Sequence, residues 1–239
     1  MYDRQAREKK ARTILAVLQD FLGSNTNSMN LLDIGASTGI IDSFLADFFG
    51  SVIGLDIDTE AIEFAKNSFS KNNLEFRVAD AMDLDFQDNA FDIVVCTHIY
   101  EHVPNPDTLM QEIYRVLKPG GICYFAAGNR MSLMEPHYRL PFLSIIPRSL
   151  AHIYMRLTGK GKYYHEKHLM LSGLRKLVRS FTLHDYTTKI IDDPLRFKAE
   201  YMLKPNSTKH TLAKFIAHFA YWLCPTYIWI LGKPLQSKL

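Results

Sequence analysis

Residues 31–39 of the chain read LLDIGASTG, and the fold on either side of them follows from this stretch. Leu31, Leu32 and Ile34 supply a short apolar strand, and the small residues after them form a tight turn. Apolar residues then recur at helical spacing up to about Phe49. A strand that passes through such a turn into a helix brings backbone close to a ligand at the helix N-terminus. The stretch therefore predicts a site for a nucleotide-type cofactor.

The composition is that of a folded protein with no marked charge bias. Of the 239 residues, 47% are hydrophobic, which excludes global disorder. The net charge of +3 is mild and gives no reason to expect a nucleic-acid partner. Cys96, Cys123 and Cys224 are scattered and form no CxxC pair, which fits a reducing compartment. The charged N-terminus lacks the apolar segment of a secretory signal, so we expect a cytoplasmic protein.

Strands and helices alternate from residue 30 to residue 128. We expect strands at 31–34, 51–58, 74–86 (ending in an acidic turn), 91–98 and 122–128. We expect helices at 4–22, from the turn to about 49, at 59–69 with Thr59 as its N-cap, and at 106–118. The near-continuous apolar run in 91–98 suits a parallel strand covered on both faces. The pattern predicts an α/β fold, Rossmann-like and doubly wound, with a mainly parallel sheet and helices on both faces.

The alternation breaks at Asn129. Residues 129–165 are rich in Pro, Arg, His and Tyr and are expected to form an insertion. A helix at 165–181 and strands at 182–191 and 196–203 would complete a seven-stranded sheet. Residues 209–239 are expected to form a separate, apolar, helical tail, so that the main domain spans 1–208.

The turn does not suit a nicotinamide cofactor. That class uses G-x-G-x-x-G, whereas Gly35 and Gly39 have no third glycine at the expected offset. Asp33 would repel a diphosphate and suits a cationic ligand instead. Asp56, at the end of the second strand, can accept hydrogen bonds from ribose hydroxyls, and Asp80, at the end of the third, can accept from an exocyclic amine. The three acids together predict a positively charged adenosine derivative.

Five segments in this order and spacing resemble the class I S-adenosylmethionine-dependent methyltransferases. They are LLDIGASTG, GLDID, VADAMDLDF, FDIVVCTHIYEHV and YRVLKPGG. The likeness is strongest to the branch that acts on small molecules and lipids, and it covers about residues 30 to 128. EHV after the fourth strand and LKPGG before the fifth are its more specific parts.

The resemblance implies that S-adenosylmethionine is the cofactor, and it implies which residues bind it. At the methionine end these are Asp33, Gly35, Ala36, Ser37, Gly39 and Thr97. At the adenosine end they are Asp56, Ile57, Asp80, Ala81 and Met82. Ser37 departs from the pattern, because many members have a glycine there, but a small residue still fits.

Methyl transfer from a sulfonium is an in-line displacement, in which the enzyme aligns the reactants and excludes water. A general base is needed only when the acceptor carries a proton at the reacting atom. His98, which follows the fourth strand, is our candidate for that catalytic role. The alternative is that His98 only packs on the cofactor while Glu101 and His102 hold the following loop.

The insertion at 129–165 lies where this family commonly covers the acceptor, so we expect it to act as a lid. Its mixture of aromatic, basic and apolar residues suits an amphiphilic or anionic small molecule. The expected acceptor-binding residues are Tyr100, His137, Tyr138, Arg139 and Tyr163. No pair of histidines at i, i+4 comes with a matching acid, so no metal site is expected.

The tail suggests contact with a membrane. From Phe215 to Leu231 there is no formal charge, a length at the short limit for crossing a bilayer. Its Trp and Tyr residues favour the headgroup level, and lysines flank the run, so we interpret the tail as an anchor on the membrane surface. The basic residues of the N-terminal helix would favour an anionic surface too. A spanning helix, a dimer contact and a helix packed on the body are the alternatives.

We therefore predict a methyltransferase that acts on a lipid, isoprenoid or lipid-linked small molecule, located in the cytoplasm or peripherally on the inner face of a membrane. A second hypothesis keeps the enzyme but makes the acceptor a soluble sugar or metabolite, with the tail as a dimer contact. A third is a non-catalytic, cofactor-binding partner of a larger complex. The sequence indicates neither the acceptor atom nor the oligomeric state.

Overall fold

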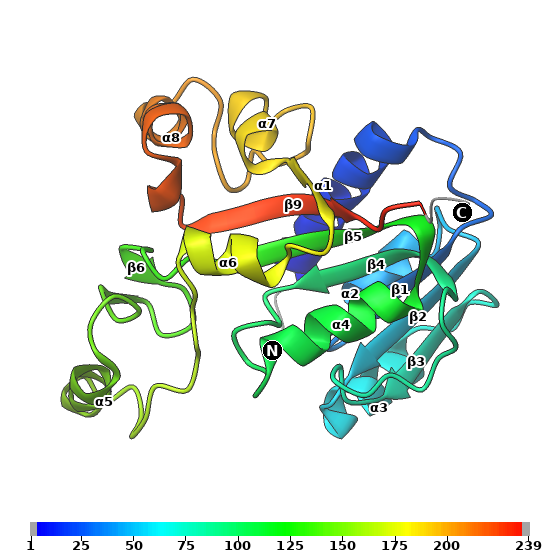
Figure 1. The fold of residues 1–239 in the computed structure, drawn as a ribbon, viewed down its shortest axis with the longest axis horizontal. Helices are drawn as coiled ribbons and strands as arrows, with labels where there is room; N and C mark the ends of the chain where they lie inside the picture. The colour runs from blue at the N-terminus through cyan, green and yellow to red at the C-terminus, as the bar shows by residue number, and fades with distance from the viewer. Residues whose placement is uncertain (1–3, 236–239) are drawn as a thin grey trace.

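The computed structural model describes residues 4–235 and contains a seven-stranded sheet covered by helices (Figure 1). The strands of this sheet are β1 (Asn30–Ile34), β2 (Ser51–Asp56), β3 (Leu74–Val78), β4 (Phe91–Thr97), β5 (Leu117–Gly128), β8 (Thr182–Asp185) and β9 (Thr226–Gly232). The helices are α1 (Arg4–Leu22), α2 (Ile40–Leu45), α3 (Thr59–Ser68), α4 (Pro106–Val116), α5 (Arg148–Leu157), α6 (Leu171–Leu177), α7 (Thr187–Asp192), α8 (Thr208–Phe219) and the 3-10 helix η1 (Tyr221–Leu223). A separate hairpin pairs β6 (Met134–Glu135) with β7 (Leu140–Pro141).

The strand order is β3-β2-β1-β4-β5-β9-β8, and only the pairings made by β9 are antiparallel. The chain winds outward from β1 to β3 and then returns to place β4 on the other side of β1. Ligands of doubly wound sheets bind at this reversal, beyond the carboxyl ends of the strands. The predicted Rossmann-like, mainly parallel, seven-stranded sheet is confirmed.

Alternate residues of each central strand enter two different cores, as strand periodicity requires. On one face, Leu32 and Val94 pack with α4 and α6. On the other, Leu31 and Ile93 pack with α1, α2 and α7. Figure 1 shows α4 and α6 on the near side of the sheet and α1 behind it. Both faces of the parallel strands are therefore buried.

Several expected elements have different bounds in the structure. The N-cap of α3 is Asp58, whose side chain accepts a hydrogen bond from the Ala61 N–H, and not Thr59. The helix expected at 165–181 is only Leu171–Leu177, and the second half of 182–191 is the helix α7. No strand forms at 196–203, where the chain makes turns, because the seventh strand comes from the tail.

The tail is not a separate element. Its last part is β9, which lies between β5 and β8 and pairs with both, so the boundary drawn at residue 209 and the wholly helical tail are wrong. Tyr227 and Trp229 are buried within the sheet. Lys233, expected as a flanking cation, is also buried, and its ammonium donates to Asn89 Oδ1 and to the carbonyls of Tyr114 and Leu117. Residues 236–239 of the expected tail and residues 1–3 of the expected main domain lie outside the described part.

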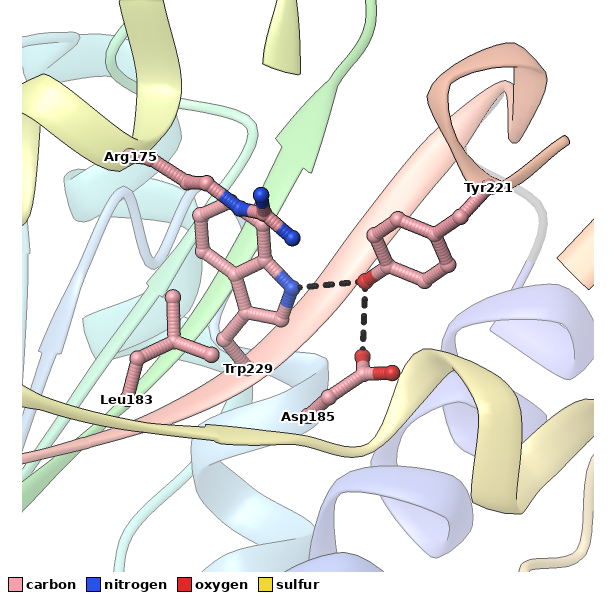
Figure 2. Close-up of a pocket in the computed structure, with 5 residues that line it drawn as sticks. All are labelled: Arg175, Leu183, Asp185, Tyr221 and Trp229. Carbon is pink, nitrogen blue, oxygen red and sulfur yellow. Dashed lines mark hydrogen bonds between the residues drawn. The ribbon is translucent and has the colours of Figure 1, made fainter. Parts of the chain in front are cut away.

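A polar chain of contacts attaches β9 to its neighbours (Figure 2). The indole N–H of Trp229 donates to the Tyr221 hydroxyl over 2.9 Å, and this hydroxyl donates to Asp185 Oδ1 over 2.8 Å. Trp229 also stacks on Phe125 of β5 and on Tyr227. The aromatic residues that suggested a membrane belt are thus largely used inside the fold.

The insertion at 129–165 has a small core of its own. It contains the β6–β7 hairpin and α5, and it lies beside the main sheet in Figure 1. The residues of this core are Leu140, Leu143, Ala151, Met155 and Tyr164. A parallel bridge between Asn129 and Leu169 closes the insertion at its base, so its two ends leave and rejoin the sheet together.

Trp229→Ala should destabilise the protein by about 3–5 kcal/mol, because it empties a buried aromatic site and leaves the Tyr221 hydroxyl without its donor. Trp222→Ala is the matched control, since that side chain is 52% exposed, and it should change stability by no more than about 0.5 kcal/mol. Urea unfolding of the two variants measures both values. A small effect at Trp229 would show that β9 is not part of the core.

Candidate active site

Two cavities open at the carboxyl ends of the central strands. The first has a volume of ≈ 360 Å³ and is lined by Ile34, Gly35, Leu55, Asp56, Ile57, Ala79, Asp80, Ala81, Met82, Ile99, His102, Val103 and Pro104. The second has a volume of ≈ 340 Å³ and is lined by Ala6, Arg7, Lys10, Gly35, Ser37, Ile41 and Thr97. Gly35 lines both, so the cavities adjoin at the turn after β1. All five residues expected at the adenosine end line the first cavity. Ser37 and Thr97 line the second.

The two glycines of the turn have different roles. Gly35 has a φ of +89°, and a Cβ added there would lie 2.1 Å from Ile99 Cδ1, so only glycine leaves this part of the cleft open. Gly39 has a φ of +72°, and its Cβ would meet the Phe76 ring at 2.4 Å. Gly39 therefore allows the turn to pack on β3. Neither Gly39 nor buried Ala36 lines one of these two cavities, and their contact with the cofactor stays a prediction.

Asp56 and Asp80 shape the turns at the ends of their strands. Asp56 Oδ2 accepts from the Ser37 N–H over 2.8 Å and Oδ1 accepts from the Asp58 N–H over 3.0 Å. Asp80 Oδ1 accepts from the Met82 N–H over 2.9 Å. Both acids therefore cap local backbone as well as line the first cavity, where the adenosine end of the cofactor is expected.

Asp33 is buried at the end of β1 beside a second buried acid, Asp42 of α2, which the sequence reasoning missed. Asp33 Oδ1 and both oxygens of Asp42 have no hydrogen-bond partner. Burial raises the pKa of Asp33 to about 7, against the attraction of Lys10. Burial, and next the charge of Asp33, raise the pKa of Asp42 well above its usual range. Because the charge of Asp33 opposes ionisation of Asp42, Asp42 keeps its proton while Asp33 is ionised.

Asp33 itself does not line either cavity. Lys10, which lines the second cavity, is close enough to Asp33 for each residue to influence the pKa of the other. A buried carboxylate with an unpartnered oxygen fits a cationic group of a cofactor, because such an oxygen is costly to leave unpaired.

Helix α1 supplies two cations to the second cavity that sequence reasoning had assigned to a membrane surface. Lys10 donates from Nζ to Thr97 Oγ1 over 3.3 Å, and Arg7 donates to Ser37 Oγ over 3.3 Å. Burial lowers the pKa of Lys10, although the charge of Asp33 opposes this. Arg7 and Lys10 of α1 thus lie at the cleft, where they suit the carboxylate of an amino-acid group.

His98 is held firmly at the end of β4. Its φ of +58° is unusual for a residue other than glycine, and its N–H donates to the Ala126 carbonyl over 2.8 Å. Its Nδ1 lies 3.2 Å from Oε1 of Glu101, whose side chain is fully buried while that of His98 is 29% exposed. Burial alone would raise the pKa of Glu101, but the hydrogen bond and charge of His98 outweigh it, and that pKa is lowered. The pair has the form of a histidine oriented by a carboxylate.

The residues expected at the acceptor are not all in one place. Tyr100 is buried, donates to the Gly128 carbonyl and accepts from the Leu169 N–H, so it braces the base of the insertion and its expected acceptor role is wrong. Arg139 and Tyr163 are exposed on the insertion. His137 and Tyr138 lie together against the buried Glu135, which sequence reasoning missed.

Comparison with known proteins identifies the domain. A family model described as a methyltransferase domain matches residues 32–125. A ubiquinone biosynthesis O-methyltransferase of Hydrogenovibrio crunogenus is 28% identical over 152 residues, which is 62% of this chain and 59% of the relative. A demethylmenaquinone methyltransferase of Lactococcus lactis is 32% identical over 127 residues, or 50% of each chain. The chain thus spans about half the length of the curated relatives it matches.

The fold agrees with solved structures. A crystal structure of an S-adenosylmethionine-dependent methyltransferase from Mesorhizobium loti superposes with a TM-score of 0.58 over 92% of this chain and 97% of that chain, at 15% identity. At that identity the likeness is one of fold, so the chemistry depends on the residues of the site.

Asp33→Asn should weaken the binding of S-adenosylmethionine about tenfold or more, because a charged hydrogen bond is typically worth about 1.5–3 kcal/mol. Since the pKa of Asp33 is raised to about 7, the carboxylate is protonated at lower pH, and binding by the wild-type protein should strengthen as pH rises through 7. Calorimetric titration between pH 5.5 and 8.5 measures this, with exposed Asp47→Asn as control. A variant with wild-type affinity and pH dependence would remove Asp33 from the site.

The cleft after β1, the acids at three neighbouring strand ends and the match over residues 32–125 agree with one another. Residues 32–125 therefore carry a methyltransferase domain, and the chain around them has the fold of the S-adenosylmethionine-dependent methyltransferases to which it is similar.

Proposed function

We propose that the chain transfers a methyl group from S-adenosylmethionine to a lipid or lipid-linked small molecule of the quinone kind. The relatives whose names specify a ubiquinone or menaquinone precursor carry this proposal. The structure supports it through apolar side chains that remain exposed on the insertion and on α8. A soluble acceptor is the alternative, and it fits the burial of the tail's last part in the sheet.

The cofactor site would use the two adjoining cavities. The residues of the larger cavity would hold the adenosine, and Asp33, Gly35 and Ser37 would hold the methionine end with Lys10 of α1. When bound, S-adenosylmethionine supplies an electrophilic methyl group. The apolar Ile99, which closes over Gly35, would help to exclude water from that end.

His98 would act as general base toward an acceptor hydroxyl. With Nδ1–H donating to Glu101, the tautomer leaves Nε2 as the atom that accepts a proton. The buried Glu101 would then stabilise the resulting imidazolium, so it is a positioning residue in this proposal.

His98→Ala should lower kcat about 10²–10⁴-fold on a hydroxyl acceptor, which is the usual contribution of a general base, and should leave the affinity for S-adenosylhomocysteine unchanged. Activity of the variant should recover as pH rises, because the acceptor then ionises without help. Transfer of labelled methyl groups to quinone-precursor phenols measures the rate, and exposed His218→Ala is the control. A wild-type rate in His98→Ala would assign the histidine to packing only.

The membrane part of the proposal now rests on α8. Leu212, Phe215 and Phe219 share one face of this helix at i, i+3 and i+7, and they are 58%, 59% and 78% exposed. Trp222, which follows, lines an apolar cavity of ≈ 440 Å³ with Met131, Met170 and Leu171. Lys209 and Lys214 lie on the same helix. An apolar face with neighbouring lysines suits the surface of an anionic bilayer. Among the described residues, no helix is both long and apolar enough to span one.

Replacing Phe215 and Phe219 together by Ser should reduce flotation with anionic phospholipid vesicles about tenfold, because the two exposed rings supply most of the apolar area available to the interface. Phe64→Ser is the matched control, since Phe64 of α3 is 52% exposed and lies at the other end of the sheet. If the wild-type protein does not float, or floats as well without the two rings, the acceptor is delivered from solution.

A further inference from the structure

A cluster of one carboxylate and two imidazoles lies beside the cleft, and its three residues line neither of the cavities assigned to the cofactor. Glu135 and His137 come from the β6–β7 hairpin, and His168 comes from the segment that returns to the sheet. One ligand atom from each lies within 4.8 Å of the other two. Residues more than 30 positions apart are thus brought together where the insertion meets the ends of β4 and β5.

The geometry converges on a single oxygen. His137 Nδ1 lies 2.7 Å from Glu135 Oε1, and His168 Nε2 lies 3.4 Å from the same atom. The other oxygen of Glu135 accepts from the Tyr138 N–H over 2.8 Å, which fixes the carboxylate plane. The side chains of Glu135 and His168 are 0% and 3% exposed, and that of His137 is 30% exposed. The carboxylate is therefore rigid and shielded, and one edge of the cluster is open to solvent.

We infer that Glu135, His137 and His168 bind a divalent cation of the zinc type. Two imidazoles and one carboxylate are a donor set that suits Zn²⁺, and three protein ligands leave one position of a tetrahedral ion for another ligand. Bond lengths of about 2.0–2.2 Å would place the three ligand atoms roughly 3.3 Å apart, so His168 Nε2 is already at that distance from Glu135 Oε1 and His137 Nδ1 would move outward by about 0.6 Å. The ion would replace the hydrogen-bonding protons that now lie between the ligands.

The surroundings supply the outer contacts that such a site needs. His168 Nδ1 is buried with no hydrogen-bond partner, and so is Oε2 of Glu101. Both side chains pack against Gly128, where an added Cβ would lie 3.0 Å from His168 Nδ1 and 3.5 Å from Glu101 Oε1. A metal-ligating histidine typically donates its second N–H to a carboxylate, and the Glu101 carboxylate is the buried acid near His168 Nδ1. A side chain at position 128 would press on the His168 ring, which would have to shift by a few tenths of an ångström.

The position of the site suggests what the ion would do. His102, which lines the adenosine cavity, packs edge-on against the His137 ring at 4.9 Å between centroids. A cation on Glu135, His137 and His168 would cross-link the β6–β7 hairpin to the segment that precedes α6, at the rim of the cleft. The insertion would then be fixed over the acceptor side by a metal bond in addition to its small core.

The test is direct metal binding by the full-length protein, freed of ions with a chelator. We expect one Zn²⁺ per chain by elemental analysis and by calorimetry, and a rise in Tm when Zn²⁺ is added. His137→Ala and His168→Ala should each weaken binding about tenfold or more and abolish the rise in Tm. His165→Ala is the control, because this exposed histidine of the same segment is outside the cluster.

A pure hydrogen-bond network gives the opposite results. Zinc would then bind substoichiometrically, or equally well to wild type, His137→Ala and His168→Ala, and either result overturns the inference. Glu135→Gln separates loss of a ligand from loss of folding, since the amide keeps an acceptor for the Tyr138 N–H. It should show a native circular dichroism spectrum and no bound ion. Because the readout is binding, the result does not depend on the proposed acceptor.

Discussion

The buried carboxylate of Asp33 is the constraint around which the cofactor half of the molecule is arranged. Removing a charge from water is costly unless a partner of opposite charge compensates it. Here the neighbours are Asp42, which holds a proton, and Lys10, whose own pKa is lowered by burial. Asp33 precedes the glycine turn, and the groups that act on its carboxylate come from α1, α2 and β2. An unpartnered oxygen remains, and a cationic ligand would satisfy it.

The position of the insertion at 129–165 depends on a different constraint, which is the place of β9 between β5 and β8 in the sheet. The Asn129 side chain, at the end of β5, donates to the carbonyls of Trp222 and Cys224 and to the Tyr227 hydroxyl. The point where the insertion leaves the sheet is therefore tied to the strand that ends the described chain. Contacts between residues about 95 positions apart position the insertion relative to the cleft.

The features that could be predicted from the sequence are those that local sequence patterns determine. Residues 31–39, the acids at the strand ends and the strict alternation up to residue 128 led to the correct fold and to six of the 13 residues that line the first cavity. The pattern could not distinguish a buried strand from an apolar anchor in the tail, because both are apolar runs with aromatic residues. Nor could it find Lys10 or Asp42 at the cleft, since their partners are set by packing between elements. The sequence showed no metal-binding motif, because Glu135 and His137 lie more than 30 residues before His168 and the fold brings them together.

The match to the methyltransferase domain ends at residue 125, before the insertion begins. This division has a physical reason. In the function we propose, the backbone turns and strand-end acids of the common fold would hold the cofactor, whereas the segments that pack beyond the fifth strand would hold the acceptor. In this chain that region has its own core, a buried Glu135 with two histidines, and an exposed apolar face on α8. Our proposal therefore assigns specificity for the acceptor to residues 129–170 and 208–222, which lie outside the match to the methyltransferase domain.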